Sequence, residues 1–432
     1  MGKYYSYKDS NVSWIGEVPT EWPSLRLRYY LTLEKGSKPV DISSIPNGNL
    51  PYLTMDYLRG RDNKSVQFPV NTDNLTCVNE SDILVLWDGA NAGEIVRAKS
   101  GYLSSTMAVI RFDKSVFDGN FLFFFLKALE PVLKDYSSGT TIPHFDSSIL
   151  LDEHYCIPSL GEQIVIAKHL NDVFEKTGLV IREKEQIAIE LQELKNSIIN
   201  ESICGQFIEG CSFADSGDEF IGVIPSHWSI QKTLRCLSMP ITDGPHTTPD
   251  LFDSGIPFVS AEAVSCGNGR IDFSHIRGYI SEEFYEECCK KYIPQRDDIY
   301  MIKSGATTGR VAIVDTDERF TIWSPLAAFR CDREKMLPMF LFYALQAPFF
   351  QKQVELGWSF GTQQNIGMRV LEQLKIPVPP IEEQTMIVRS LEDKINKIDK
   401  AAEEIATQIA DLEEYSYGLV FEAVTGKVDL CN

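Results

Sequence analysis

Residue types that could do chemistry occur along the chain, but their spacing does not form a catalytic centre. The stretch SGATTGR at 304–310 is similar to a phosphate-binding loop, yet it lacks the GxxxxGK[ST] spacing, and Arg310 directly follows its second glycine. We therefore interpret it as a tight turn between strands. The six histidines show no HExxH or HxH spacing that would predict a metal site. The acidic cluster at 282–287 has the spacing of a solvated helix face.

Motifs of a DNA-modifying enzyme are missing as well. The stretch VPPI at 378–381 has neither the asparagine nor the aromatic residue of an Asn-Pro-Pro-aromatic site, and no cofactor-binding glycine motif accompanies it. The ten cysteines include the adjacent pair Cys288 and Cys289 but no Cys-x-x-Cys, which favours reduced thiols over disulfides or zinc. We expect no catalytic residues, no metal and no cofactor on this chain.

Length and charge limit the classes of protein to which this chain can belong. The 432 residues carry 61 acidic and 41 basic side chains, a formal net charge of −20, and this length is typical of two or three domains. A uniform negative charge would oppose approach to nucleic acid. No run of about 18 apolar residues predicts a membrane span, and residues 1–10 lack the apolar core of a secretory signal. Together with the reduced thiols, this gives the expectation of a cytoplasmic protein.

The sequence repeats itself in order over nearly its whole length. WIGEVPTEW at 14–22 returns as FIGVIPSHW at 220–228, and DGANAG at 88–93 returns as SGATTG at 304–309. Further pairs are NFLFFFL (120–126) with MFLFYAL (339–345), SSGTT (137–141) with SFGTQ (359–363), and IPSLGEQ (157–163) with VPPIEEQ (378–384). Chance matches would not keep their order, so we infer a tandem duplication of a unit of about 200 residues.

The sequence pattern of each repeat predicts a head of mixed helices and strands (α/β), followed by one long helix. The fold class predicted for the whole chain is therefore α+β. Short β-rich runs such as 83–86 and 310–314 are separated by turn residues. One apolar helix is expected at about 119–134 and its twin at about 337–352. The predicted segments are a first head at 1–156, a central helix at 157–207, a connector at 208–219, a second head at 220–377 and a C-terminal helix at 378–432.

Both predicted helices carry a heptad seam, in which apolar residues alternate at spacings of four and three. This 3.5-residue period is typical of a coiled coil, and the order of the two seams favours an antiparallel pair about 48 Å long. Polar seam residues such as Lys184 and Gln408 either fix the register or are merely tolerated. The predicted pairing residues are Leu170, Val173, Val180, Ile187, Leu191, Leu194, Leu391, Ile398, Ile405 and Leu412.

The ordered set of motifs resembles the specificity subunits of type I restriction–modification enzymes. The resemblance covers essentially the full length, including both repeats. Its residues are WIGEVPTEW and FIGVIPSHW, the GEQ and EEQ that precede the long helices, DILVLWDGANAG (82–93), DIYMIKSGATTGRVAIV (298–314) and the ending FEAVTGKVDL (421–430).

The resemblance implies a non-enzymatic DNA-recognition subunit. Each head would be a target-recognition domain that reads one half of a bipartite target. The helical pair would set the gap and dock two methyltransferase subunits, which bind S-adenosylmethionine, while motor–nuclease subunits cut unmodified DNA. Two alternatives stay open: a coiled-coil scaffold whose two heads bind protein partners, and an enzyme that acts on DNA itself.

Four polar loops offer the residue types that read bases or anchor phosphates. They lie at 59–64, 137–144, 243–249 and 359–365. Two of these loops, 137–144 and 359–365, are counterparts in the repeat; they share a frame but differ in side chains, as two heads with different half-sites would. The candidate DNA-binding residues are Arg59, Arg61, Asn63, Lys64, Thr140, Thr141, His144, His246, Thr247, Thr248, Thr362, Gln363, Gln364 and Asn365.

The distribution of charge removes the objection to nucleic acid. The first head holds 15 basic and 19 acidic residues, and the second holds 16 and 18. The heads therefore account for −6 of the −20, and the helices with their connector account for −14. We expect weak DNA binding by the chain alone, with partner subunits supplying much of the phosphate contact.

Overall fold

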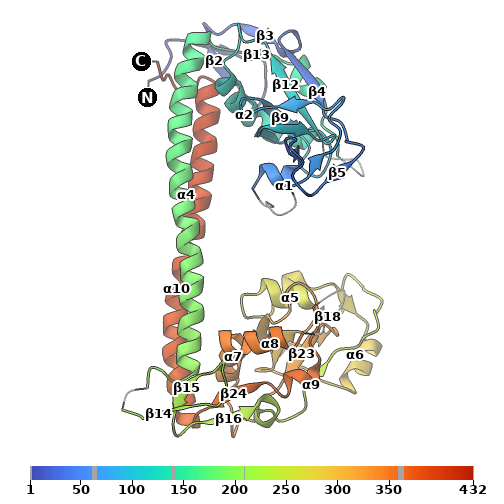
Figure 1. Ribbon diagram of the computed structural model, residues 1–432, viewed down its shortest axis with the longest axis vertical. Coiled ribbons are helices and arrows are strands. Elements are labelled where there is room, and N and C mark those ends of the chain that lie inside the picture. The colour runs from blue at the N-terminus through green and yellow to red at the C-terminus, as the bar shows by residue number, and fades with distance from the viewer. Residues whose placement is uncertain (1, 61–65, 138–142, 209, 359–363, 432) are drawn as a thin grey trace. The chain divides into compact units, whose positions relative to one another are not determined.

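The computed structural model describes residues 2–60, 66–137, 143–208, 210–358 and 364–431. The chain divides into two compact units, Met1–Lys184 with Thr407–Asn432, and Glu185–Ala406. Each unit contains one head and part of each long helix (Figure 1). The units cut across the two helices because each head packs against residues of both. Within the described residues, no helix is long and apolar enough to span a membrane.

The first head is built on a four-stranded antiparallel sheet in the order β10-β9-β12-β4, with a smaller sheet β6-β11-β8 beside it. Its elements are β1 (Tyr7–Asp9), β2 (Glu17–Pro19), β3 (Ser24–Arg26), η1 (Leu27–Tyr29), β4 (Leu31–Lys35), β5 (Ile42–Ser43), β6 (Tyr52–Leu53), α1 (Met55–Leu58), β7 (Phe68–Pro69), β8 (Cys77–Val78), β9 (Ile83–Leu86), β10 (Ile95–Arg97), β11 (Gly101–Leu103), β12 (Met107–Phe112), α2 (Gly119–Ser137), α3 (Ser147–Asp152) and β13 (His154–Cys156).

The second head repeats this plan with the order β21-β20-β23-β17. Its elements are β14 (Phe213–Asp215), β15 (Val223–Pro225), β16 (Ser229–Lys232), η2 (Thr233–Cys236), β17 (Thr242–Asp243), β18 (Ile256–Val259), α5 (Ala261–Cys266), η3 (Phe273–His275), β19 (Tyr279–Ile280), α6 (Glu282–Cys289), β20 (Ile299–Ile302), β21 (Val311–Ile313), β22 (Thr321–Ile322), β23 (Leu326–Phe329), α7 (Pro338–Gln346), α8 (Pro348–Leu356), α9 (Met368–Leu371) and β24 (Lys375–Val378). The shared strand order confirms the duplication.

The apolar helix of the head is continuous in one repeat and broken in the other. In the first head α2 runs as one helix, with Pro131 inside it. In the second head the expected single helix over 337–352 was wrong, because α7 ends at Gln346 and α8 begins at Pro348. A proline has no backbone N–H and disfavours helical geometry in the residue before it. Ala347 is accordingly non-helical, with ψ of 138°.

The two long helices, α4 (Leu160–Ile203) and α10 (Ile381–Val424), run antiparallel within each unit. In the first unit the Lys184 ammonium donates to Gln408 Oε1 at 2.5 Å, and the Ser416 hydroxyl donates to that of Thr177 at 3.3 Å. Residue numbers thus fall on α10 as they rise on α4. In the second unit the Lys195 ammonium pairs with an Asp399 carboxylate oxygen at 2.6 Å, in the same sense.

The heptad seam exists, but part of it was predicted one residue too early. Leu170 and Leu391 are fully buried, and Ile398 is 9% exposed. Partial burial is found for the predicted pairing residues Val173, Leu191, Ile405 and Leu412.

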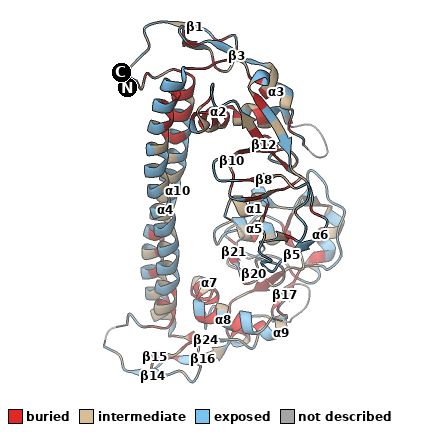
Figure 2. Ribbon diagram, turned by 45° about the horizontal axis from the view of Figure 1, so that its top comes forward, coloured by how far each residue is buried: buried red, intermediate tan, exposed pale blue. Residues whose placement is uncertain are grey.

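The three misplaced residues lie on one face of α4. Val180, Ile187 and Leu194 are 39%, 43% and 48% exposed, whereas the residue that follows each of them is less exposed. At Ile187 and Leu194 the prediction selected the more apolar of two neighbouring positions, whereas Val180 and Ile181 are both apolar and composition could not distinguish them. In the last case the seam position is Lys195, whose stem is covered while its ammonium reaches Asp399. Figure 2 shows how much of the surface of both helices is exposed.

A buried glutamine ties the start of each long helix to its head. Gln163 donates to the carbonyls of Val116 and Pro158 at 2.8 and 3.0 Å and accepts from the Asp118 N–H at 2.8 Å. These bonds satisfy two backbone groups of the loop before α2 and one carbonyl just before α4.

The second repeat makes the same three bonds. Gln384 donates to the carbonyls of Lys335 and Pro379, both at 2.9 Å, and accepts from the Leu337 N–H at 2.8 Å. Both glutamine side chains are at least 99% buried. The glutamine of the GEQ and EEQ motifs therefore joins helix to head.

The IGxxPxxW motif packs on the end of the other long helix. In the first unit, Gly426 follows α10 with φ of +71°, and an added Cβ would lie 2.3 Å from Pro19. The Trp22 indole donates to Glu162 on α4 at 3.1 Å. Trp22 thus contacts the beginning of one helix and the end of the other.

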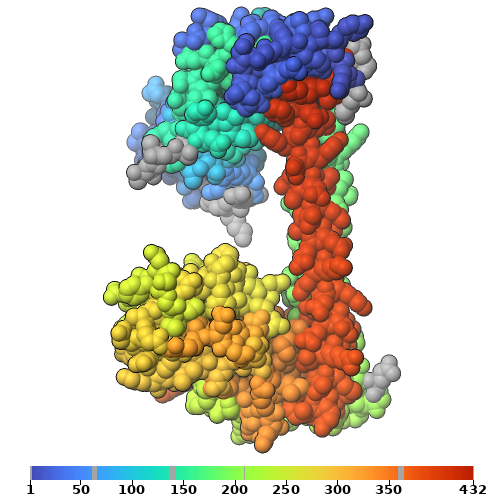
Figure 3. Space-filling view, turned by 180° about the vertical axis from the view of Figure 1, so that it is seen from behind, coloured from blue at the N-terminus to red at the C-terminus, as the bar shows by residue number. Residues whose placement is uncertain are grey.

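The second unit repeats this junction with Gly205, Trp228 and Glu383. An added Cβ at Gly205 would lie 2.6 Å from Trp228, whose indole donates to Glu383 at 2.8 Å. In the first unit the chain ends also meet, because Gly2 and Asp429 form an antiparallel bridge. Figure 3 shows the N-terminal residues against the end of α10.

We predict that Gln384→Leu lowers the free energy of unfolding by about 1–3 kcal/mol, because it removes the partner of one buried carbonyl and of one N–H and one carbonyl that are partly buried. Gln186→Leu is the matched control, since that side chain is exposed on α4 and bonds only to Glu190. It should change stability by less than about 0.5 kcal/mol. Urea unfolding followed by circular dichroism would compare them, and equal losses would refute the role of Gln384.

Candidate nucleic-acid interface

Half of the predicted DNA-binding residues lie outside the described residues. These are Arg61, Asn63, Lys64, Thr140, Thr141, Thr362 and Gln363. The described ones are Arg59, His144, His246, Thr247, Thr248, Gln364 and Asn365, and they fall around the strand–turn–strand motif of each head.

In the first head, the DGANAG turn joins β9 to β10 and forms a bridge with the residues that end the loop at 137–144. Asp88 and His144 are paired in this bridge. The Gly89 N–H donates to the Pro143 carbonyl at 3.1 Å, and the Phe145 N–H donates to the Trp87 carbonyl at 2.8 Å. The end of the predicted loop is thereby fixed on the turn.

The second head makes the same backbone contacts between the SGATTG turn and the residues that end the loop at 359–365. Ser304 and Asn365 form the bridge. The Gly305 N–H donates to the Gln364 carbonyl at 3.0 Å, and the Ile366 N–H donates to the Lys303 carbonyl at 2.9 Å. The turn between β20 and β21 is confirmed as a turn. We call this shared backbone arrangement the loop frame.

Side chains on the first loop frame form a charged group. Asp88 accepts from the Lys35 ammonium at 2.9 Å and contacts His144 Nδ1 at 2.6 Å. Burial disfavours the charged carboxylate, but the bonds from Lys35 and His144 outweigh that effect, so the pKa of Asp88 is lowered. The Lys35 ammonium also lies over the Trp87 ring, 5.3 Å from its centroid. His144 remains 61% exposed.

A different charged group supports the second loop frame. Asp243, only 1% exposed, forms ion pairs with Lys291 and with Lys303 at 3.2 Å, and its Oδ2 lies 3.3 Å from His246 Nε2. Burial would raise its pKa, but the hydrogen bonds and charges of the two lysines outweigh it, so the pKa of Asp243 is lowered. Lys303 precedes the bridge residue Ser304, so Asp243 joins the loop at 243–249 to the frame.

The loop at 243–249 begins with a close backbone approach. An added Cβ at Gly244 would lie 1.8 Å from the Ile322 carbonyl oxygen, so glycine is required there. The next residues turn outward, and His246, Thr247 and Thr248 are exposed. This arrangement presents one imidazole and two hydroxyls beside the loop frame.

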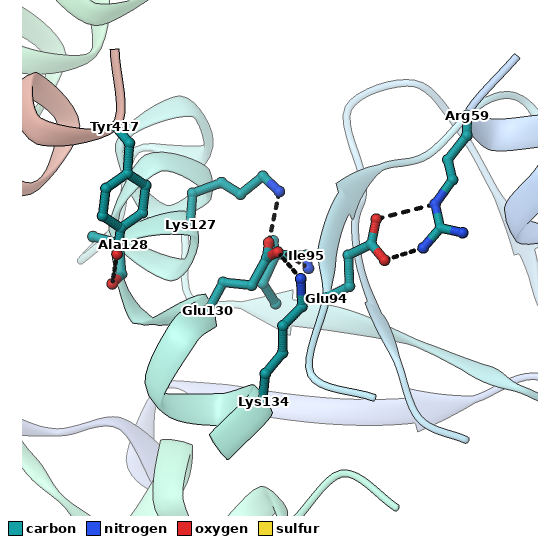
Figure 4. A network of polar contacts seen from close by, with 8 residues as sticks. All are labelled: Arg59, Glu94, Ile95, Lys127, Ala128, Glu130, Lys134 and Tyr417. Atoms are coloured by element: carbon teal, nitrogen blue, oxygen red, sulfur yellow. Dashed lines mark hydrogen bonds and ion pairs between the residues drawn. The ribbon is translucent and has the colours of Figure 1, made fainter. Parts of the chain in front are cut away.

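Arg59 is held by an internal ion pair rather than directed outward. Its Nε donates to Glu94 Oε1 at 3.2 Å, and its Nη2 donates to Glu94 Oε2 (Figure 4). Only 22% of the Arg59 side chain is exposed. Next to Glu94, the Ile95 N–H donates to Glu130, which Lys127 and Lys134 also contact. Arg59 therefore braces the segment after α1 against the strand–turn–strand, and its role as a base reader stays a prediction.

Sequence reasoning missed the ionic groups that support the frames. Lys35, Asp88, Asp243, Lys291 and Lys303 were not among the predicted residues. The repeat alignment of DGANAG with SGATTG pointed to Asp88, which lies two positions after the buried strand β9. Lys291 carried no sequence signal, because the fold brings it to Asp243 from the end of α6, 48 positions away.

The comparisons with known proteins agree with this architecture. The model of the type I restriction modification DNA specificity domain matches residues 19–190 and 245–410, one match in each repeat. The chain belongs to this family. The match confirms the resemblance that the sequence motifs indicated.

Relatives cover nearly the whole chain. The chain is 29% identical over 433 residues to the type I restriction enzyme MjaVIII specificity subunit of Methanocaldococcus jannaschii, covering 99% of this chain and 98% of the relative. It is 23% identical to the EcoBI specificity subunit of Escherichia coli, covering 81% and 74%. A chain from a structural study of assembly and conformational transition in the type I R-M system has a TM-score of 0.65 at 17% identity, covering 95% and 99%, and so shares the fold.

We predict that Asp243→Asn lowers the free energy of unfolding by about 1–3 kcal/mol at pH 7, because it leaves two lysines near a neutral group. Because the folded pKa of Asp243 is lowered, its stabilising effect is full above the unfolded pKa of about 3.9. The effect is lost as the pH falls through the folded pKa. The difference from wild type should therefore be constant between about pH 5 and 8 and shrink below about pH 4.

Asp317→Asn is the matched control, because Asp317 pairs with Arg296 on the surface and is 77% exposed. Its effect should be small at any pH, because solvent screens an exposed ion pair. Urea unfolding of both variants from pH 3 to 8 would measure this. A pH-independent loss in Asp243→Asn would show that its ionisation does not stabilise the head.

Proposed function

We propose that this chain is the DNA-specificity subunit of a type I restriction–modification complex and that its two heads read the two halves of a bipartite target. The observation that carries the proposal is the loop frame, which has the same backbone hydrogen bonds in both heads but different side chains. A conserved backbone with variable donors and acceptors is what two readers of different base sequences require. Membership of the specificity family supports the same function.

The side chains of the two frames suit different base edges. The first frame offers the Asp88 carboxylate, which accepts hydrogen bonds, beside the exposed His144. The second frame offers Ser304 and Asn365, a hydroxyl and an amide that both donate and accept. A carboxylate can accept from a cytosine or adenine amino group, whereas an amide suits adenine in the major groove.

The helical pair, in this proposal, sets the length of the gap between half-sites and docks two methyltransferase subunits. The uninterrupted lengths of α4 and α10 and their antiparallel contacts support the first role. Val180, Ile187 and Leu194 support the second, because they form an exposed apolar row with a spacing of seven residues on α4. Apolar side chains in such a row are suited to cover by a partner.

The chemistry is assigned to the partners. The methyltransferase subunits would bind S-adenosylmethionine, and motor–nuclease subunits would cut unmodified DNA. This chain would contribute neither cofactor nor catalytic residue and would act by positioning the enzyme on its target. In the part of the chain that the structure describes, no group of three or more His, Cys, Asp and Glu residues could hold a metal ion.

Reconstitution with a type I methyltransferase subunit from the same organism tests the proposal. We expect methyladenine at one bipartite sequence, read by single-molecule sequencing of modified plasmid DNA. Methylation by the methyltransferase without this chain should lack that sequence preference. Assembly of the complex without specific DNA binding would favour the scaffold alternative, and methylation by this chain alone would favour an enzyme.

A spacer variant gives a quantitative prediction. Seven residues inserted into α4 and seven into α10, opposite each other next to Lys184 and Gln408, keep the heptad register. They lengthen the pair by about 10 Å, which should lengthen the recognised gap by about three base pairs. Both half-sites should stay unchanged. An unaltered gap in the methylated sequences would contradict the spacer role.

A double-mutant cycle separates bracing from base reading at Arg59. If Arg59 acts through Glu94, then Arg59→Ala, Glu94→Ala and the double variant should each weaken target binding to a similar extent. If Arg59 reads a base, Arg59→Ala alone should cost about 1–3 kcal/mol of target affinity and relax one position of the first half-site. Equilibrium DNA binding by the assembled complex, on cognate and single-mismatch targets, distinguishes them.

A further inference from the structure

A polar cleft of about 560 Å³ lies in the second unit between α4 and the second head. Residues of the SGATTGR stretch, Thr308, Gly309 and Arg310, form part of its wall. On the helix side it is lined by Gln192, Lys195, Asn196 and Ile199. Neither the loop frame nor the helix seam accounts for this cleft.

The turn that forms the wall is fixed from behind. Gln351 donates to the Gly309 carbonyl at 2.9 Å and to the Leu345 carbonyl at 2.6 Å. Gly309 has φ of +93°, and an added Cβ would lie 2.4 Å from the Gln351 amide oxygen. A glycine is therefore required there, and the backbone is held so that Arg310 follows at a set place on the rim.

The Arg310 guanidinium places a positive charge at the cleft, and no carboxylate of the described head neutralises it. Its Nη1 donates to the Ser265 carbonyl at 3.1 Å. Among the described residues, no carboxylate lies within ion-pair distance of it. Arg296 and Arg330 of the same head are paired with Asp317 and Asp298, whereas Arg277 lies over the Trp323 ring instead. Four of the five N–H donors of a guanidinium can still bind a ligand once the bond to Ser265 is counted.

The first head differs at this position. The repeat aligns Arg310 with Glu94, which forms the ion pair with Arg59. The first head therefore has the Glu94 carboxylate, neutralised by Arg59, at the position where the second head has the Arg310 guanidinium without an ion-pair partner among the described residues. The difference belongs to the second head and is not a shared feature of the fold.

The lining of the cleft suits an anion. The described residues that line it include two cations, Lys195 and Arg310, and no carboxylate. Lys195 is committed to Asp399, so the uncompensated charge comes from Arg310. The amides of Gln192, Asn196 and Gln346 add neutral donors. Asp399 stands beside the lining but is neutralised by Lys195, so a phosphate in this cleft meets little repulsion within a chain of net charge −20.

We propose that this cleft binds a phosphate of the DNA backbone next to the second half-site, with Arg310 as its main cation. The proposal rests on the proposed function, since it assumes that the second head reads DNA. The turn at 304–310 links base reading to phosphate binding. Ser304 at its beginning belongs to the loop frame, and Arg310 at its end lines the cleft. Phosphate contacts fix the register of a protein on DNA, while base contacts give specificity.

The test uses the assembled complex with Arg310→Ala. Binding to cognate and to unrelated DNA should weaken by a similar factor, about 5–10-fold near physiological salt. The slope of log affinity against log salt should become smaller by about one, because one phosphate contact releases one counterion fewer. Arg310→Lys, which retains the charge, should recover the slope.

Arg296→Ala is the matched control, because it removes an arginine from the same head that is paired with Asp317 and does not line the cleft. It should leave affinity and slope unchanged. An unaltered slope in Arg310→Ala would overturn the phosphate site. Loss of affinity for the cognate target alone would also overturn it, because Arg310 would then read a base.

Two further outcomes separate this inference from the proposed function. If Arg310→Ala prevents assembly, measured by light scattering without DNA, then the cleft binds an acidic segment of a partner and the phosphate site is wrong. If the wild-type complex assembles but does not bind its target, the proposed function fails together with this inference. Specific binding by wild type with an unchanged slope in the variant would refute the phosphate site alone.

Discussion

The junction between each head and the long helices depends on one buried glutamine. Gln163 and Gln384 are themselves buried, and each satisfies one N–H and two carbonyls at the junction of head and helix. Because an unpaired buried polar group costs about 1–3 kcal/mol, a side chain with both donor and acceptor is required there. The neighbouring Glu162 and Glu383 accept from the tryptophans of the IGxxPxxW motifs. The motifs that identified the repeats are therefore the parts that join head to helix.

This junction allows the two heads to differ elsewhere. Each head keeps the sheet, the helix above it and the loop frame, and the frame fixes where a variable side chain stands. The lysine and the aspartate that support the loop frame occupy different elements in the two repeats. In the first head a lysine on β4 contacts an aspartate of the turn, and in the second an aspartate on β17 contacts a lysine before the turn. The same ionic bond is thus made with its partners exchanged, while the residues exposed on the frames differ.

The negative charge of the chain fits a subunit that acts within a complex. The heads are nearly neutral, and several of their cations are used internally, as Arg59 is by Glu94 and Lys291 by Asp243. The described second head nevertheless has Arg310 on a cleft without carboxylates. Local arrangement of a few cations, rather than net charge, then decides where a polyanion can be held.

The sequence by itself determined the duplication, the strand–turn–strand motifs, the two long helices and their antiparallel heptad pattern. These features depend on local periodicity and on residues that recur in order. Tertiary structure decided what local pattern could not. Pro348 interrupted one helix. The seam contains Ile181, Ala188 and Lys195 in place of Val180, Ile187 and Leu194, and Asp243 forms ion pairs with lysines from distant segments. Burial and ion pairing depend on what the folded chain places opposite each residue, and that information is not contained in spacing alone.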